Sequence, residues 1–315
     1  MRLAMYAHAK HGDEPMAGVV QGDRVLNAAG LLGERTPLDM QSLLNRGPDT
    51  MMRLREAAER FAADHQSTLT VPEDVAVALW EVDLLAPVPH PPAIRDFYAF
   101  EQHVATAHAR RGRPVPPAWY DVPVFYFGNP AAIYGPNADI PKPSATKELD
   151  FELEIACVIG RRGRDIPAAD ANEYIAGYTI MNDWSARDLQ RQEMSVGLGP
   201  AKGKDFATSL GPYLVTPDEL AGSFHDGRHD LAMIARINGE EVTRGNANSI
   251  HWTFAQMIER ASQDVDLMPG DVIGSGTVGG GCLLELGEAI HPWLEPGDEV
   301  ELAIECLGRL RNRIV

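Results

Sequence analysis

The chain has 315 residues, of which 44% are hydrophobic and 23% charged, and its formal net charge is -17. This composition is that of a globular protein with one large core or a core and a satellite domain, and it excludes global disorder. The acidic excess argues against a nucleic-acid partner, because no basic stripe offsets it. No apolar run reaches the roughly 20 residues that cross a bilayer, and the first residues lack a signal-peptide pattern. We therefore expect a cytoplasmic protein with no membrane partner.

Residues 1–85 have the pattern of a small α+β domain. Gly22 and Asp23 stand between two short apolar segments, which predicts a hairpin. Residues 37–44 and 49–61 then show helical spacing of apolar side chains. The proline-rich residues 82–92 cannot be helical, so we expect them to join this domain to a second domain over residues 86–315.

The second domain is predicted to be mostly β within the α+β class. Its Val, Ile, Tyr and Phe segments are short and are separated by Gly and Pro. Asn238 and Gly239 predict another hairpin, and residues 252–261 have the clearest helical pattern.

Acidic residues alternate with apolar residues at 150–155. In a strand, Asp150, Glu152 and Glu154 share one face, and three neighbouring anions need either open water or a cation. This segment alone is compatible with a solvated edge strand or with a metal site. Asp183, which follows the apolar segment 174–180, favours the metal site. Two glutamates and an aspartate form an all-oxygen site suited to Mg2+, Mn2+ or Ca2+.

Other polar residues are ambiguous by themselves. His103 follows Asp96 by seven residues, and a lone histidine is usually structural or exposed. Lys202 and Lys204 stand in a glycine-containing loop, where they either meet an anion or remain solvated. The glycines within 267–286 allow a ligand to approach the backbone closely and can present N–H groups to an anion, but they also suit a tight β corner.

The cysteines give no metal-binding or disulfide pattern. Cys157, Cys282 and Cys306 are widely separated and contain no Cys-x-x-Cys pair. We expect reduced core residues, not ligands or nucleophiles.

Four ordered motifs make residues 90–315 resemble the fumarylacetoacetate hydrolase family. They are Asp-Phe-Glu-Leu-Glu at 150–154, Asn-Asp-Trp-Ser-Ala-Arg-Asp at 182–188, Gly-Lys-Asp-Phe at 203–206 and Met-Pro-Gly-Asp-Val-Ile-Gly-Ser-Gly-Thr at 268–277. The resemblance implies a mixed β-roll or barrel catalytic domain behind the small N-terminal α+β domain.

The resemblance also implies a role for each residue of the site. The metal ligands would be Asp96, Glu152, Glu154 and Asp183. His103 would be the general base, Glu285 its orienting partner and Lys204 a stabiliser of the enolate. The substrate would meet Arg187, Gln190, Tyr98, Tyr126 and Thr277.

The function implied is metal-dependent hydrolysis of a carbon-carbon bond in a 1,3-diketo acid. His103 would activate water, and a divalent cation, with Mg2+ favoured over Mn2+ or Ca2+, would hold the enolate. The alternative is a metal-dependent decarboxylase, or a keto-enol isomerase or hydratase, of a 2-oxo acid. A metal-binding protein without turnover is a third reading. The family resemblance further implies a small keto acid as substrate and a homodimer.

Overall fold

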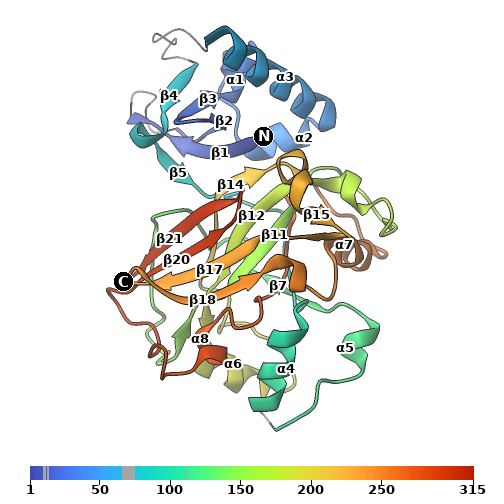
Figure 1. Ribbon diagram of the computed structural model, residues 1–315, viewed down its shortest axis with the longest axis vertical. Coiled ribbons are helices and arrows are strands. Elements are labelled where there is room, and N and C mark those ends of the chain that lie inside the picture. The colour runs from blue at the N-terminus through green and yellow to red at the C-terminus, as the bar shows by residue number, and fades with distance from the viewer. Residues whose placement is uncertain (10–11, 13, 66–74, 111) are drawn as a thin grey trace.

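A long mixed sheet runs through the molecule in the computed structural model, which describes every residue except 10–11, 13, 66–74 and 111 (Figure 1). The strand order is β4 (Ala76–Ala78), β3 (Arg24–Asn27), β2 (Met16–Gln21), β1 (Arg2–Ala7), β14 (Thr208–Val215), β12 (Ile175–Asp183), β11 (Leu153–Ile159), β19 (Val272–Gly274), β6 (Ile94–Phe97) and β7 (Phe125–Gly128). Two short strands attach at its side, β5 (Asp83–Leu85) to β1 and β8 (Ile133–Tyr134) to β14. Neighbours along the main path are antiparallel except β6 and β19, which are parallel.

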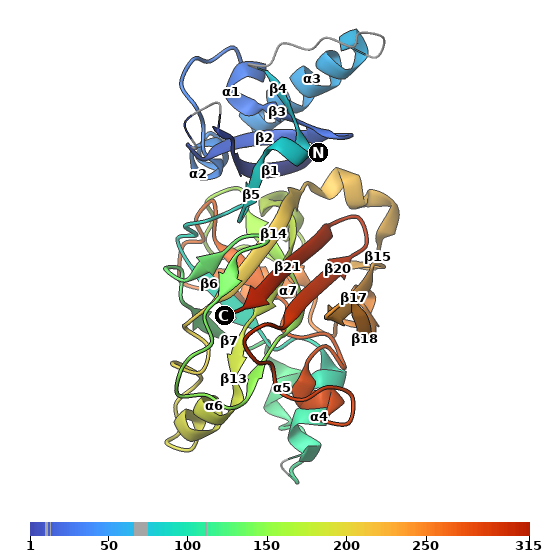
Figure 2. The same cartoon turned by 90° about the vertical axis from the view of Figure 1, so that its left-hand side faces the viewer.

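A second sheet lies against the middle of the first. Its order is β18 (Glu240–Asn246), β17 (Ala232–Ile237), β20 (Glu299–Ile304), β21 (Gly308–Ile314) and β9 (Asp139–Ile140). Figure 2 shows β20 and β21 crossing beside β14, with α7 (Phe254–Ser262) behind them. Side chains of both sheets and of α7, among them Ile155, Leu302 and Met257, form one buried apolar cluster. The strand-rich α+β class predicted from the sequence is confirmed.

The N-terminal elements share their core with the main sheet. α1 (Ala28–Leu31), α2 (Met40–Asn45) and α3 (Pro48–His65) pack with the first strands at one end of the molecule (Figure 1). Their buried cluster also includes Val158 of β11 and Leu214 of β14, and β1 pairs directly with β14. This sheet continuity joins the module to the rest of the chain. The domain division at residue 85 stays a prediction.

Short elements gather at the opposite end of the molecule. Both views place α4 (Glu101–Arg110), α5 (Ala118–Asp121) and α6 (Arg187–Met194) there, far from the N-terminal helices (Figures 1 and 2). The remaining elements are α8 (Leu283–Leu286), β10 (Leu149–Asp150), β13 (Ser185–Ala186), β15 (Phe224–His225), β16 (Arg228–His229) and the 3-10 turns Leu79–Glu81, Ala171–Tyr174, Pro217–Ser223 and Ala247–Ser249. Within the described ranges, no helix combines the length and apolarity needed to cross a membrane.

The two predicted hairpins are present, and the helix predicted at 252–261 is present with a later start. Residues 22–23 join β2 to β3, and Asn238 and Gly239, with φ values of 52° and 85°, join β17 to β18. Thr253 caps α7 in a reciprocal box with Gln256, so this helix begins two residues after the predicted start.

The acidic segment differs from the predicted continuous strand. The chain leaves β10 after Asp150 and enters β11 at Leu153, and β11 is interior, between β12 and β19. Asp150, Glu152 and Glu154 are 0%, 5% and 0% exposed, which rules out the solvated edge strand. The break also separates the three carboxylates, because Asp150 turns to Arg187 and to the backbone N–H groups of residues 283 and 284.

The predicted burial of the cysteines is confirmed for two residues and wrong for one. Cys157 and Cys282 are free and buried, as expected. Cys306 is exposed, because it occupies the turn between β20 and β21 with a φ of 64°.

Candidate active site

Four carboxylates from three strands of the main sheet meet at one place. Asp96 is the next-to-last residue of β6, and Asp183 is the last residue of β12. Glu154 lies in β11, and Glu152 directly precedes that strand. Each offers an oxygen, and the four oxygens lie within 4.8 Å of one another. The side chains are buried, since none of the four residues exceeds 5% exposure. The structure thus brings together the whole predicted ligand set.

Glycines of β19 and the loop after it let these carboxylates approach one another. A Cβ on Gly274 would lie 2.5 Å from Asp96 Oδ1. Gly276, at a φ of +76°, donates its N–H to Asp96 Oδ1 and to Glu154 Oε2, at 3.1 Å each. The anion expected beside the glycine-rich segment is therefore, in part, the protein's own carboxylate pair.

Buried cations offset only part of this negative charge. Lys204 donates to Glu152 Oε2 at 2.6 Å and also contacts Asp183. Arg187 lies 2.8 Å from Glu152 Oε1 and 2.8 Å from Asp150 Oδ2, so its guanidinium is held by the protein's own carboxylates. Its predicted contact with substrate stays a prediction.

The pKa values reflect this imbalance. Burial and the neighbouring carboxylates raise the pKa of Asp96 and of Glu154 well above their ordinary values. Burial also raises the pKa of Asp183, against the opposing effect of Lys204. For Glu152, burial acts upward but Lys204 and Arg187 outweigh it, so the pKa falls below its usual range.

The donor set fits a divalent cation. Glu154 Oε1 is buried without a hydrogen-bond partner among the described residues, as expected of an oxygen reserved for an ion. An all-oxygen set with excess negative charge suits Mg2+, Mn2+ or Ca2+. The cluster does not distinguish among the three.

A histidine and a glutamate form a second polar pair beside the cluster. His103, in the first turn of α4, hydrogen-bonds through Nδ1 to Glu285 Oε1 of α8. Glu285 is fixed in turn by the Gly280 N–H, 3.1 Å from Oε2. Tyr98 packs edge-on against the imidazole, with ring centroids 5.2 Å apart. Because Nδ1 is engaged, Nε2 is the nitrogen left for acid-base exchange with the cavity.

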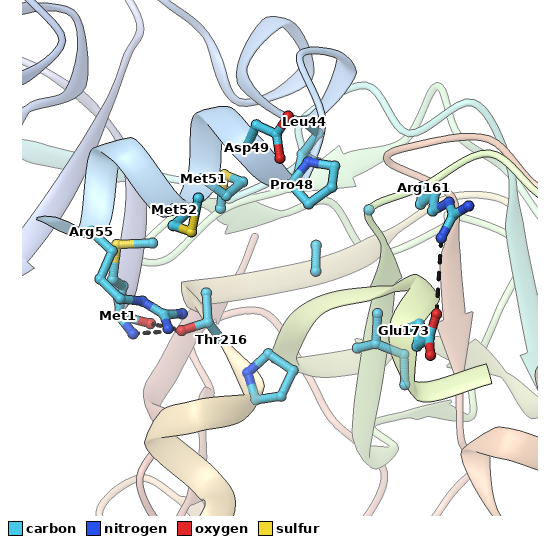
Figure 3. A pocket seen from close by; sticks show the side chains of 14 residues that line it. Met1, Leu44, Pro48, Asp49, Met51, Met52, Arg55, Arg161, Glu173 and Thr216 are labelled. Atoms are coloured by element: carbon cyan, nitrogen blue, oxygen red, sulfur yellow. Dashed lines mark hydrogen bonds and ion pairs between the residues drawn. The ribbon is translucent and has the colours of Figure 1, made fainter. Parts of the chain in front are cut away.

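A cavity of about 380 Å3 elsewhere lacks such chemistry. It lies between the N-terminal helices and the main sheet, with Met51 and Met52 on one wall (Figure 3). Its Arg55 pairs with Asp218 at 2.6 Å, and its Arg161 lies 3.9 Å from Glu173. Its lining contains no histidine, cysteine or carboxylate cluster among the described residues, so we do not place the active site there.

The candidate active-site cavity has a volume of about 430 Å3 and joins the two polar groups. Predicted residues in its wall are Asp96, Tyr98, His103, Tyr126, Glu152, Glu154, Arg187, Gln190, Lys204 and Thr277. The other two predicted residues lie just behind it, since Asp183 accepts from Tyr126 and Glu285 from His103. Sequence reasoning missed the wall residues His108, Arg113, Phe125, Met194 and Leu284. For Arg113, the sequence does offer a signal, because it ends a run of basic residues shortly after His103.

Comparisons with known proteins agree with this fold and site. The family model for the C-terminal domain of fumarylacetoacetate (FAA) hydrolase matches residues 93–315. The chain is 33% identical over 319 residues to the bovine protein named oxaloacetate tautomerase FAHD2A, mitochondrial, covering 100% of this chain and 92% of that protein.

Solved structures resemble the whole chain as well. A 5-carboxymethyl-2-hydroxymuconate delta-isomerase from Mycobacterium smegmatis gives a TM-score of 0.68 at 27% identity, covering 100% of this chain and 99% of the other. A fumarylacetoacetate hydrolase from Exiguobacterium antarcticum gives 0.73 at 26% identity, with the same coverage. The fold and the buried acidic site define a class of enzymes, with hydrolases, isomerases and tautomerases among the relatives. The chain belongs to the fumarylacetoacetate hydrolase family.

Proposed function

We propose that this chain is a divalent-metal-dependent tautomerase that interconverts the keto and enol forms of a 2-oxo dicarboxylic acid of the oxaloacetate type. The observation that carries the proposal is the oriented His103–Glu285 pair beside the carboxylate cluster. The full-length similarity to an oxaloacetate tautomerase supports it. The comparisons thus favour the isomerase alternative over hydrolysis, which the sequence analysis put first.

The chemistry needs a proton to leave the carbon next to a carbonyl and to return at the carbonyl oxygen. A divalent cation held by Asp96, Glu152, Glu154 and Asp183 would supply Lewis acidity to the 2-oxo group. His103 Nε2 accepts the carbon-bound proton, and Glu285 stabilises the resulting imidazolium through Nδ1. The same proton, or one exchanged with it, is then delivered to the enolate oxygen, so that no atom is gained or lost.

We assign two further groups to the stabilisation of the enolate. The Lys204 ammonium lies in the cavity wall, and its pKa is raised because Asp183 and Glu152 outweigh the effect of burial. It therefore stays charged and donates to the developing oxyanion. Thr277 Oγ1 is buried in the same wall without a partner among the described residues, and it can bind the substrate carboxylate or its 2-oxo oxygen.

A dicarboxylate also needs cations in a chain with a net charge of -17. Arg113 is exposed and contributes to the same wall, whereas Lys204 is 5% exposed. We assign Arg113 to the second carboxylate, because its guanidinium can bind a carboxylate with two hydrogen bonds.

Hydrolysis of a 1,3-diketo acid is the second candidate. The same His103–Glu285 pair supports it as well, because an oriented imidazole can also take a proton from water. The resulting hydroxide would attack the distal carbonyl and break the carbon-carbon bond, which leaves an acid and an enolate.

The deciding experiment follows the loss of enol-oxaloacetate by absorbance, with Mg2+ and with a chelator. Metal-dependent acceleration that is lost in His103→Gln and kept in Glu288→Gln supports the tautomerase, since Glu288 is exposed. Mass spectrometry of the same mixtures, and of acetylpyruvate and fumarylpyruvate, detects the other reactions. Two acid products would establish the hydrolase, and carbon dioxide with pyruvate would establish a decarboxylase. Metal binding without any turnover would indicate a non-catalytic protein.

A further inference from the structure

Three side-chain atoms of kinds that bind metals lie together, and one of them belongs to the proposed base, His103. Cys282, His103 and Glu285 each offer one such atom, and these lie within 4.8 Å of one another. Cys282 Sγ is 3.6 Å from Glu285 Oε1, the oxygen that also pairs with His103 Nδ1. The side chains are buried: Cys282 is 0% exposed and His103 5%.

The chemistry of this group differs from that of the carboxylate cluster. It offers sulfur, nitrogen and oxygen, whereas the cluster offers oxygen alone, and the two groups share no residue. Thiolate and imidazole select zinc and similar ions, whereas oxygen sets select Mg2+ and Ca2+. One protein can therefore hold two cations of different kinds at these two places.

The distance between the Cys282 and Glu285 ligand atoms suits a tetrahedral ion. Zn2+ bonds of about 2.3 Å to sulfur and 2.0 Å to oxygen place those two ligands about 3.5 Å apart. The observed Sγ to Oε1 distance is 3.6 Å. His103 must give up its hydrogen bond to Glu285 and present Nδ1 to the ion.

We propose that His103, Cys282 and Glu285 form a second, inhibitory site for Zn2+ or a similarly thiophilic divalent cation. Binding releases the thiol proton of Cys282 to solvent and moves the imidazole proton from Nδ1 to Nε2. A protonated Nε2 cannot accept the substrate proton, so the ion blocks the base. Only this inhibitory consequence rests on the proposed function. The binding site itself does not.

The surroundings of Cys282 argue against a role as a free nucleophile. Burial and the nearby carboxylates of Asp150 and Glu285 raise the pKa of its thiol well above the ordinary value, although Arg187 opposes this. A free thiolate is therefore disfavoured, whereas a thiolate that shares a divalent cation has its charge balanced.

The entry path is the active-site cavity. His103 and Leu284 form part of its wall, and Cys282 and Glu285 lie two residues before and one residue after Leu284 in the sequence. Because His103 lines the cavity and Cys282 does not, the ion is expected to displace the imidazole as it enters. Inhibition should accordingly develop over time and be reversed by a chelator.

The test uses the full chain in saturating Mg2+, with Co2+ as a spectroscopic probe and Zn2+ as the competing ion. A thiolate bound to Co2+ gives a near-ultraviolet charge-transfer band. The wild type is expected to show this band and to retain one Zn2+ per chain after dialysis against Mg2+. Cys282→Ser should lose the band and bind Zn2+ at least tenfold more weakly, whereas Cys306→Ser, at the exposed cysteine, should match the wild type.

A band that persists in Cys282→Ser, or that disappears in Cys306→Ser, would overturn the proposal. If Cys282→Ser does not fold, the double variant Cys157→Ala/Cys306→Ser leaves Cys282 as the sole thiol, and its band must remain. The band reports binding without turnover. A Cys282-dependent band in a protein that is inactive on oxaloacetate would support the zinc site and contradict the proposed function. Activity on oxaloacetate without such a band would contradict only the zinc site.

Discussion

Lys204 Nζ lies 2.6 Å from Glu152 Oε2, although the neighbouring Lys202 is solvated and pairs with Asp205. The two lysines differ by two positions in one loop, yet only Lys204 enters the acidic site. This pair provides the sharpest control for the proposed chemistry.

Replacing Lys204 should slow catalysis without abolishing metal binding. We expect Lys204→Met to lower kcat by about 100-fold or more, because one donor to a developing oxyanion contributes roughly 3 kcal/mol. Calorimetric Mg2+ affinity should stay equal or increase, since a competing cation has been removed. Lys202→Met should behave as the wild type, and equal losses in both variants would contradict the assignment.

Removing one carboxylate should separate metal binding from folding. Glu154→Gln is expected to leave the metal-free protein at least as stable as the wild type, because burial and the neighbouring Asp96 disfavour the charged form of Glu154. Its Oε1 also lacks a hydrogen-bond partner among the described residues. Its Mg2+ affinity should fall by about tenfold or more, with loss of the Mg2+-induced rise in Tm. Glu173→Gln, at an exposed glutamate, is the control. A normal Tm shift in Glu154→Gln would remove Glu154 from the ligand set.

The orienting role of Glu285 predicts an effect on rate alone. Glu285→Gln should lower kcat by about 100-fold or more, since the imidazolium loses its anionic partner. Mg2+ affinity should not change, because Glu285 lies outside the oxygen cluster. Glu288→Gln serves as the matched control. Wild-type kcat in Glu285→Gln would mean that His103 does not work through this pair.

His229 should make the fold sensitive to acid, independently of the active site. Burial lowers its pKa from 6.5 to about 4, and its Nε2 has no partner among the described residues. The unfolded chain binds the proton more readily between these values, so stability is full above about pH 6.5 and falls toward pH 4. The loss is at most about 3 kcal/mol.

Thermal unfolding at pH 7 and at pH 5 measures this loss. His229→Phe should flatten the pH dependence, because the side chain packs among the rings of Tyr178 and Phe224. His225→Gln, at an exposed histidine, should retain it. An unchanged slope in His229→Phe would place the acid-sensitive group elsewhere.

The sequence by itself determined the local chemistry and the family motifs. Alternation around Glu152 and Glu154, the turn at Asn238-Gly239 and the order of the motifs depend only on neighbouring residues, so they predicted the strand-rich fold and the acidic ligand candidates. The catalytic and substrate-binding roles assigned to individual residues followed from the family resemblance.

Only the tertiary structure decided which charges meet. The break after Asp150 sends that carboxylate to Arg187, and the interior position of β11 turns an ambiguous acidic segment into a buried site. Lys204 acquires Asp183 and Glu152 from 21 and 52 residues away. His103 acquires Glu285 from 182 residues away. Burial and charge balance are properties of these long-range contacts, and residue spacing carries no record of them.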